Sequence, residues 1–152
     1  MKFKSVKAPQ TKSIALVAHD NMKQSLIDWC LAHEQKLSNH NLFATGTTGS
    51  LLEHESNLRL KKLISGPLGG DQQIGAMITG QLIDLMIFYW DPLEAQPHDP
   101  DVKALIRLAA VWNIPVACNV ATADFLINSP LFDQPYQRRI PDYQRYIESR
   151  TK

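Results

Sequence analysis

The sequence predicts an α/β fold, a three-layer sandwich in which a central, mostly parallel sheet lies between helices on both of its faces. Short apolar segments alternate along the chain with segments of helical periodicity. Such alternation is typical of βαβ units, which build parallel sheets with helices on both faces. The clearest strand is Ile83–Tyr89 (IDLMIFY), and it has the apolar character of a strand that is buried on both sides.

The first half of the chain supplies three predicted strands and two predicted helices. Ser13–Ala18 (SIALVA) is a short apolar run that predicts a buried strand. Asn21–Leu37 is predicted to be a helix, because apolar residues recur at i, i+4, i+7 and i+8 from Met22. The elements expected next are a strand at Asn41–Ala44, a helix at Gly46–Ser56 and a weaker strand at Leu58–Ile64.

The second half repeats this pattern after the glycine-rich loop SGPLGG. Asp71–Gly80 is predicted to be a helix that precedes the strand Ile83–Tyr89. Trp90–Pro100 contains three prolines and is expected to be a loop. The remaining elements are an amphipathic helix at Asp101–Trp112, a strand at Ile114–Cys118, a short helix at Thr122–Ile127 and a last helix at Tyr143–Arg150.

Length and composition limit the class of protein. A chain of 152 residues is long enough for one domain with a sizeable core. We expect a single domain over residues 1–152, of which residues 1–11 form a flexible tail. The formal net charge of +1 provides no basic field that would attract nucleic acid.

Nothing in the sequence indicates a membrane partner or export. The apolar run Leu82–Trp90 has the length of a strand, whereas a membrane span needs roughly 20 residues. The N-terminus lacks the apolar core of a signal peptide. Cys30 and Cys118 lie in apolar patterns without metal-ligand spacing. These features predict a cytoplasmic protein with reduced, buried thiols.

Polar residues follow the ends of the predicted strands. The carboxyl ends of parallel strands meet at one edge of a sheet, and ligands of such folds bind at that edge. These residues therefore predict where a site lies. They are His19 and Asp20, Thr45, Ser65 and Gly66, Trp90 and Asp91, and Asn119.

Phe43–Leu52 (FATGTTGSLL) is the most informative segment. It passes from a strand into a Gly/Thr loop and then opens a helix, where free N–H groups and the positive end of the helix dipole favour an anion. The expected ligand is a phosphate. The alternative is a helix capped by threonine after a tight glycine turn. The second glycine-rich loop, Ser65–Gly70, also agrees with a phosphate site. Lys23 is either a further phosphate ligand or simply an exposed lysine.

Asp71 opens the helix after that second loop, and its residue type leaves two interpretations open. It is either an N-cap carboxylate or a general base that abstracts a proton alpha to a carbonyl group. His98 and His19 are candidates for polarising a carbonyl oxygen or passing a proton. Asp99 and Pro100 are explained as the N-cap and first residue of the next helix.

The positions of the other three histidines do not indicate a catalytic role. His33, His40 and His54 are interpreted as surface residues. The sequence contains no metal-ligand spacing, no Walker motif and no dinucleotide-binding fingerprint. We therefore expect neither a metal nor a cofactor.

Five segments together resemble one known family. They are IALVAHDNMK, FATGTTG, SGPLGGDQQIGAMI, IFYWDPLEAQPHDPDVKALIRLA and NIPVACNVATADF. With them the chain resembles the methylglyoxal synthase family over nearly all of residues 12–127, and PDYQRYI extends the resemblance. The resemblance implies conversion of dihydroxyacetone phosphate to methylglyoxal and inorganic phosphate without a metal or cofactor. It also implies a cytoplasmic homohexamer that inorganic phosphate inhibits with cooperative effects.

The resemblance further implies a role for each candidate residue. Asp71 would be the catalytic base that yields an enediolate, His98 would stabilise the developing negative charge, and His19 would bind substrate beside it. The phosphate would be held by Lys23, Thr45, Gly46, Thr47, Thr48, Ser65 and Gly66. The supporting polar neighbours would be Asp20, Asp91 and Asp101, with Asp101 a candidate partner of His98.

Two other classes of protein share parts of this pattern. A non-catalytic domain of the same fold that binds phosphorylated effectors would keep the Gly/Thr loop without needing Asp71 and His98 together. A phospho-acceptor signalling domain would have clustered acidic residues near Asp20 and a lysine where this chain has Asn119. The joint presence of Asp71 and His98 favours the enzyme.

Overall fold

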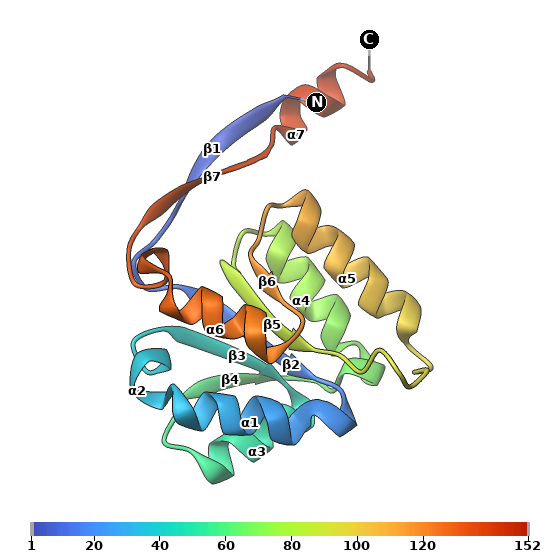
Figure 1. The fold of residues 1–152 in the computed structure, drawn as a ribbon. Helices are drawn as coiled ribbons and strands as arrows, with labels where there is room; N and C mark the ends of the chain where they lie inside the picture. The colour runs from blue at the N-terminus through green and yellow to red at the C-terminus, as the bar shows by residue number, and fades with distance from the viewer. Residues whose placement is uncertain (1, 152) are drawn as a thin grey trace.

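The computed structural model describes residues 2–151 and contains a five-stranded sheet between two layers of helices (Figure 1). The strand order is β4-β3-β2-β5-β6, and each neighbouring pair is parallel. The predicted three-layer α/β sandwich is thereby confirmed. The strands are β2 (Ser13–Ala18), β3 (Asn41–Thr45), β4 (Leu60–Leu63), β5 (Leu85–Tyr89) and β6 (Val116–Ala117).

The helices divide between the two faces of the sheet because side chains alternate along each central strand. The helices are α1 (Lys23–Ala32), α2 (Glu34–Leu37), α3 (Gly46–Glu55), α4 (Gly70–Thr79), α5 (Asp99–Val111), α6 (Val120–Asn128) and α7 (Tyr143–Glu148). In β2, Ile14 and Leu16 belong to a core with α1, α3 and α6, whereas Ala15 and Val17 belong to a core with α4 and α5. Three short 3₁₀ helices are η1 (Asp20–Met22), η2 (Gly66–Leu68) and η3 (Pro130–Phe132).

Three predicted boundaries are wrong. The helix predicted over Asn21–Leu37 is η1, α1 and α2, with a break at His33. The strand predicted at Ile114–Cys118 pairs only at its centre, in β6. The N-cap of α5 is His98 rather than Asp99, because the His98 carbonyl already accepts from the N–H of Asp101 at 2.9 Å. His98 is therefore held at the start of this helix.

The two ends of the chain form a feature that the sequence did not predict. β1 (Phe3–Ala8) pairs antiparallel with β7 (Tyr136–Pro141) in a separate two-stranded ribbon. Figure 1 shows this ribbon reaching away from the sandwich, with α7 at its far end. The expected flexible tail is thus wrong for residues 3–8. Local sequence cannot reveal a strand whose partner lies at the other end of the chain.

His40 is buried, contrary to the expectation of a surface residue. Its Nδ1 accepts from the N–H of Lys12 at 2.9 Å, and its Nε2 lies 2.9 Å from Asp133 Oδ1. The Lys12 side chain in turn donates to the carbonyl of Gln134 at 2.6 Å. These contacts hold the end of the ribbon that is nearest to Lys12 and Gln134 against the sandwich.

Both cysteines are free thiols; Cys30 is buried and Cys118 is half-buried. Burial raises the pKa of the Cys30 thiol to about 12, so this thiol is unreactive. Within residues 2–151, none of the helices is both long and apolar enough to span a bilayer. The same range contains no cluster of three or more His, Cys, Asp or Glu side chains placed to hold a metal ion.

Candidate active site

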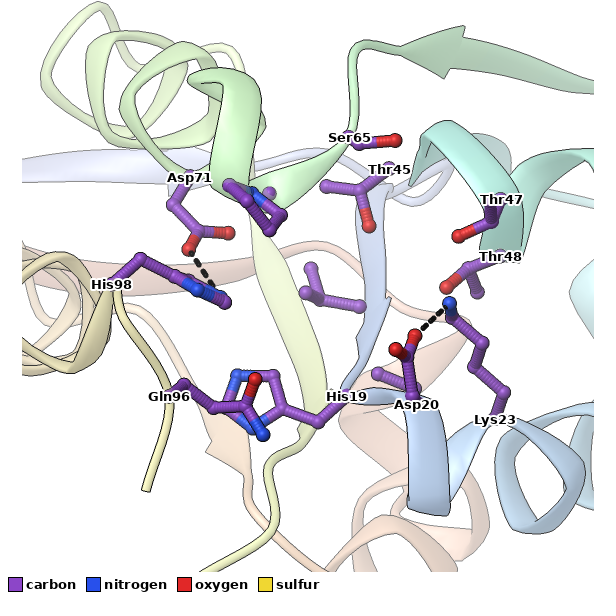
Figure 2. Close-up of a pocket in the computed structure, with 14 residues that line it drawn as sticks. His19, Asp20, Lys23, Thr45, Thr47, Thr48, Ser65, Asp71, Gln96 and His98 are labelled. Atoms are coloured by element: carbon purple, nitrogen blue, oxygen red, sulfur yellow. Dashed lines mark hydrogen bonds and ion pairs between the residues drawn. The ribbon is translucent and has the colours of Figure 1, made fainter. Parts of the chain in front are cut away.

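A pocket with a volume of about 220 Å³ lies at the carboxyl-end edge of the central sheet (Figure 2). Pockets for drug-sized ligands usually hold about 300–1,000 Å³, so this one suits a smaller molecule. The loops that follow β2, β3, β4 and β5 all contribute to its lining. The predicted site residues that line it are His19, Asp20, Lys23, Thr45, Thr47, Thr48, Ser65, Gly66, Asp71 and His98.

One side of the pocket, which we call the threonine end, is formed by Lys23, Thr45, Thr47 and Thr48 (Figure 2). Thr45 occupies the N-cap position of α3, but its side chain makes no capping hydrogen bond. Threonine capping therefore does not explain the loop. Thr48 is 1% exposed, and its Oγ1 has no hydrogen-bond partner among residues 2–151. The helix N-terminus and the unpaired hydroxyl both suit a bound anion.

Gly46 does not line the pocket but brings two of its loops together. A Cβ atom at this position would lie 2.3 Å from Ser65 Oγ and 2.8 Å from the Ser65 backbone nitrogen. Such distances are far below van der Waals contact, so only glycine allows this approach. Gly46 thereby places Ser65 next to the N-terminus of α3.

Lys23 supplies the positive charge of the threonine end. Its ammonium group donates to Asp20, and this hydrogen bond holds the pKa of Asp20 below its ordinary value. The Lys23 side chain is 17% exposed, whereas that of Asp20 is 90% exposed. Because the aspartate is almost fully solvated, it loses little when an incoming anion replaces it beside the lysine.

The opposite side, which we call the carboxylate end, contains His19, Asp71 and His98. Asp71 lies in the first turn of α4 behind the N-cap Gly69, so the N-cap interpretation of Asp71 is wrong. It is 3% exposed. Its Oδ2 lies 3.9 Å from His98 Nε2 and has no hydrogen-bond partner among residues 2–151. Burial raises the pKa of Asp71, Asp101 adds to the increase and His98 opposes it.

The hydrogen bonding of His19 determines which of its nitrogens carries the proton. His19 Nδ1 accepts from the backbone N–H of Asp91 at 3.1 Å, so in the neutral ring the proton is on Nε2. Burial, followed by the charge of His98, lowers the pKa of His19 and favours this neutral form. The buried Nε2 has no partner among residues 2–151. His19 therefore offers an uncharged N–H donor to a ligand.

The sequence of the chain is similar to those of known proteins. An MGS-like domain model matches residues 25–118. The chain is 62% identical to a methylglyoxal synthase of Saccharophagus degradans over 152 residues, which cover 100% of this chain and 99% of the relative. It is also 62% identical to a methylglyoxal synthase of Pectobacterium atrosepticum, and that alignment covers both chains completely. The chain belongs to the methylglyoxal synthase family.

A solved structure agrees with this assignment. The crystal structure of methylglyoxal synthase from Elizabethkingia anophelis superposes with a TM-score of 0.90 at 54% identity, over 95% of each chain. The resemblance found in the sequence is thus confirmed, and the chain is an enzyme of the lyase class. The roles of the individual residues remain predictions.

Two further predicted residues lie beside the pocket rather than in its lining. Asp91 acts on His19 through its backbone N–H, and its side chain accepts from Asn21 at 3.0 Å. Asp101 lies in a neighbouring cavity that Asp71 also borders. The polar lining residue that sequence reasoning missed is Gln96, two positions before His98 in a proline-rich loop. Its place in that loop, next to His98, was the only available signal.

Proposed function

We propose that this protein converts dihydroxyacetone phosphate to methylglyoxal and inorganic phosphate. The observation that carries the proposal is the buried carboxylate of Asp71, whose Oδ2 lacks a hydrogen-bond partner among residues 2–151 and which shares its pocket with Lys23 and the threonines at the N-terminus of α3. A carboxylate that removes a proton from carbon needs a free oxygen, since a C–H group does not displace a strong hydrogen-bond donor. Burial raises the pKa of Asp71 and so makes it a stronger base.

The first step is proton abstraction. With the phosphate held at the threonine end, the hydroxymethyl carbon and the ketone of the substrate lie at the carboxylate end. Asp71 takes a proton from the hydroxymethyl carbon, and the electron pair of that C–H bond moves toward the ketone oxygen. The Nε2–H of neutral His19 and the ring of His98 stabilise the negative charge on the resulting enediolate.

The second step is elimination of phosphate. The hydroxyl group of the enediolate passes its proton to the departing phosphate, its oxygen forms the aldehyde C=O, and the C=C bond moves to the carbon whose C–O bond to phosphate breaks. The enediolate oxygen takes up the proton held by Asp71, and the enol aldehyde that results ketonises to methylglyoxal. This bond breaks readily when it lies roughly perpendicular to the enediolate plane. Two loops grip the phosphate, since Gly46 holds Ser65 beside the N-terminus of α3, and together they fix this torsion. Lys23 and the threonine hydroxyls stabilise the leaving dianion.

The products formed from dihydroxyacetone phosphate test the function. Purified protein is expected to release methylglyoxal and phosphate in equal amounts and to form little glyceraldehyde 3-phosphate, and all three compounds can be followed in one time course. His98→Gln should slow turnover without changing the products, because the phosphate-binding loops remain intact. Glyceraldehyde 3-phosphate as the main product would indicate an isomerase. No consumption of substrate would favour a non-catalytic domain that binds phosphorylated effectors.

We also propose that the protein is a cytoplasmic homo-oligomer, most simply a hexamer, and that inorganic phosphate inhibits it by occupying the threonine end. Phe3 on the ribbon is 50% exposed and Ile147 on α7 is 58% exposed. Apolar side chains on an element that projects from the sandwich suit contacts with another copy. Light scattering is expected to give a mass several times the 17.2 kDa of the chain. A monomer at micromolar concentration would contradict the proposal.

A further inference from the structure

The loop between β5 and α5 turns one side chain inward. Among residues 92–97, Gln96 is half-buried while the other five are exposed. Leu93, for example, is 95% exposed. The inward orientation of Gln96 therefore distinguishes it from the other residues of 92–97, and it places the side chain in the lining of the pocket.

Gln96 belongs to the carboxylate end of the pocket. Figure 2 shows its amide on the side of His19 and His98, away from Thr47 and Thr48. Its backbone carbonyl accepts from the N–H of Asp99 at 3.2 Å, at the start of α5. This hydrogen bond ties the backbone of Gln96 to Asp99, the first residue of α5, whose N-cap is His98. The backbone of Gln96 is therefore held close to that of His98.

In the proposed reaction the carboxylate end must bind a hydroxyl group as well as a ketone. The terminal carbon of a triose phosphate carries a hydroxyl group, which both donates and accepts hydrogen bonds, beside a ketone that only accepts. Neutral His19 donates through Nε2, and Asp71 must keep an oxygen free for the C–H proton. A carboxamide supplies both a donor and an acceptor without a charge.

We propose that Gln96 binds the terminal hydroxyl group of the substrate and is therefore a specificity-determining residue. The inference rests on the proposed function, because it concerns the end of the substrate that reacts. The amide oxygen accepts the hydroxyl hydrogen, and this contact orients the hydroxymethyl carbon toward Asp71. Ligands without the hydroxyl group gain no binding affinity from Gln96.

Two ligands that differ only in this hydroxyl group test the proposal. Binding of dihydroxyacetone phosphate and of hydroxyacetone phosphate is measured by calorimetry in the Asp71→Asn background, where the first is expected to be consumed at least about a hundredfold more slowly. Adding Gln96→Leu is expected to weaken dihydroxyacetone phosphate binding about three- to tenfold, the worth of a neutral hydrogen bond. Binding of hydroxyacetone phosphate and of inorganic phosphate should not change. Gln24→Leu, the same substitution on the exposed face of α1, is the matched control and should affect none of the three.

The outcomes separate the possible errors. Equal weakening of both organic ligands would show that Gln96 acts only through the shape of the loop, and no weakening of either would show that it does not bind the hydroxyl group. Unchanged binding of inorganic phosphate establishes that the variant pocket is folded, and Gln96→Met repeats the test with a side chain of similar length. Failure of the proposed function is recognised independently, because wild-type protein would then release no phosphate from dihydroxyacetone phosphate.

Discussion

Replacing Asp71 by asparagine is expected to lower kcat by at least about a hundredfold, the usual worth of general base catalysis. The amide has nearly the same shape but cannot accept the substrate proton. Binding of inorganic phosphate should remain, because the threonine end lies on the other side of the pocket. Steady-state phosphate release and phosphate binding measured on the same preparation separate these effects. Turnover close to wild type in Asp71→Asn would move the role of the base to Asp101.

The stability of Asp71→Asn provides the control for misfolding. Burial raises the folded-state pKa of Asp71 above its ordinary value of 3.8, so folding favours the protonated carboxyl. The stabilising contribution of that proton is full below the unfolded pKa and is lost as the pH rises through the folded pKa. At pH 7 the ionised carboxylate lowers the free energy of unfolding, and asparagine avoids this cost. The variant should melt at or above the wild-type temperature at pH 7, and the difference should shrink as the pH falls. A lower melting temperature at pH 7 would mean that the carboxylate is paired.

The second large effect is expected at Lys23. Lys23→Ala should weaken binding of phosphate-bearing ligands by roughly 1.5–3 kcal/mol, about ten- to a hundredfold, because a hydrogen bond to a charged group has this worth. The free chain should remain stable, since the partner Asp20 is 90% exposed and does not become a buried charge. Calorimetric titration with inorganic phosphate measures the change.

Two further variants make this result specific. Asp20→Asn removes a negative charge from the pocket lining and should bind phosphate at least as tightly as wild type. Thr48→Val deletes a buried hydroxyl that lacks a partner among residues 2–151, so stability should hold or rise while phosphate binding weakens. If Lys23→Ala and Thr48→Val both bind phosphate as tightly as wild type, the anion site is misplaced.

The sequence allowed much of the site to be predicted because local pattern and topology act together. The short apolar runs predicted β2 and β5 well, and parallel strands bring their carboxyl ends to one edge. His19, Thr45 and Ser65 could therefore be expected in one place although they are far apart in the chain. Residue type and position made Asp71 and His98 candidates, the resemblance implied their roles, and the structure places both in the same pocket.

Other features depended on contacts that no local pattern contains. The inward turn of Gln96 places it in a pocket with residues that follow other strands of the sheet. The burial of His40 follows from the docking of Lys12 and Asp133 around it. Glutamine and histidine are residue types that are often found at the surface. Contacts with remote segments of the chain bury these two side chains partly or fully.

The sequence by itself determined the α/β fold, the alternation of the two cores and the edge at which the site lies, because these follow from the periodicity of side chains and the direction of the strands. Only the tertiary structure decided that β1 pairs with β7, that Asp91 places the proton of His19 on Nε2, and that Asp71 keeps an oxygen without a partner among residues 2–151. The physical reason is that protonation and hydrogen-bond satisfaction depend on which atoms from distant segments come within about 3 Å of each other.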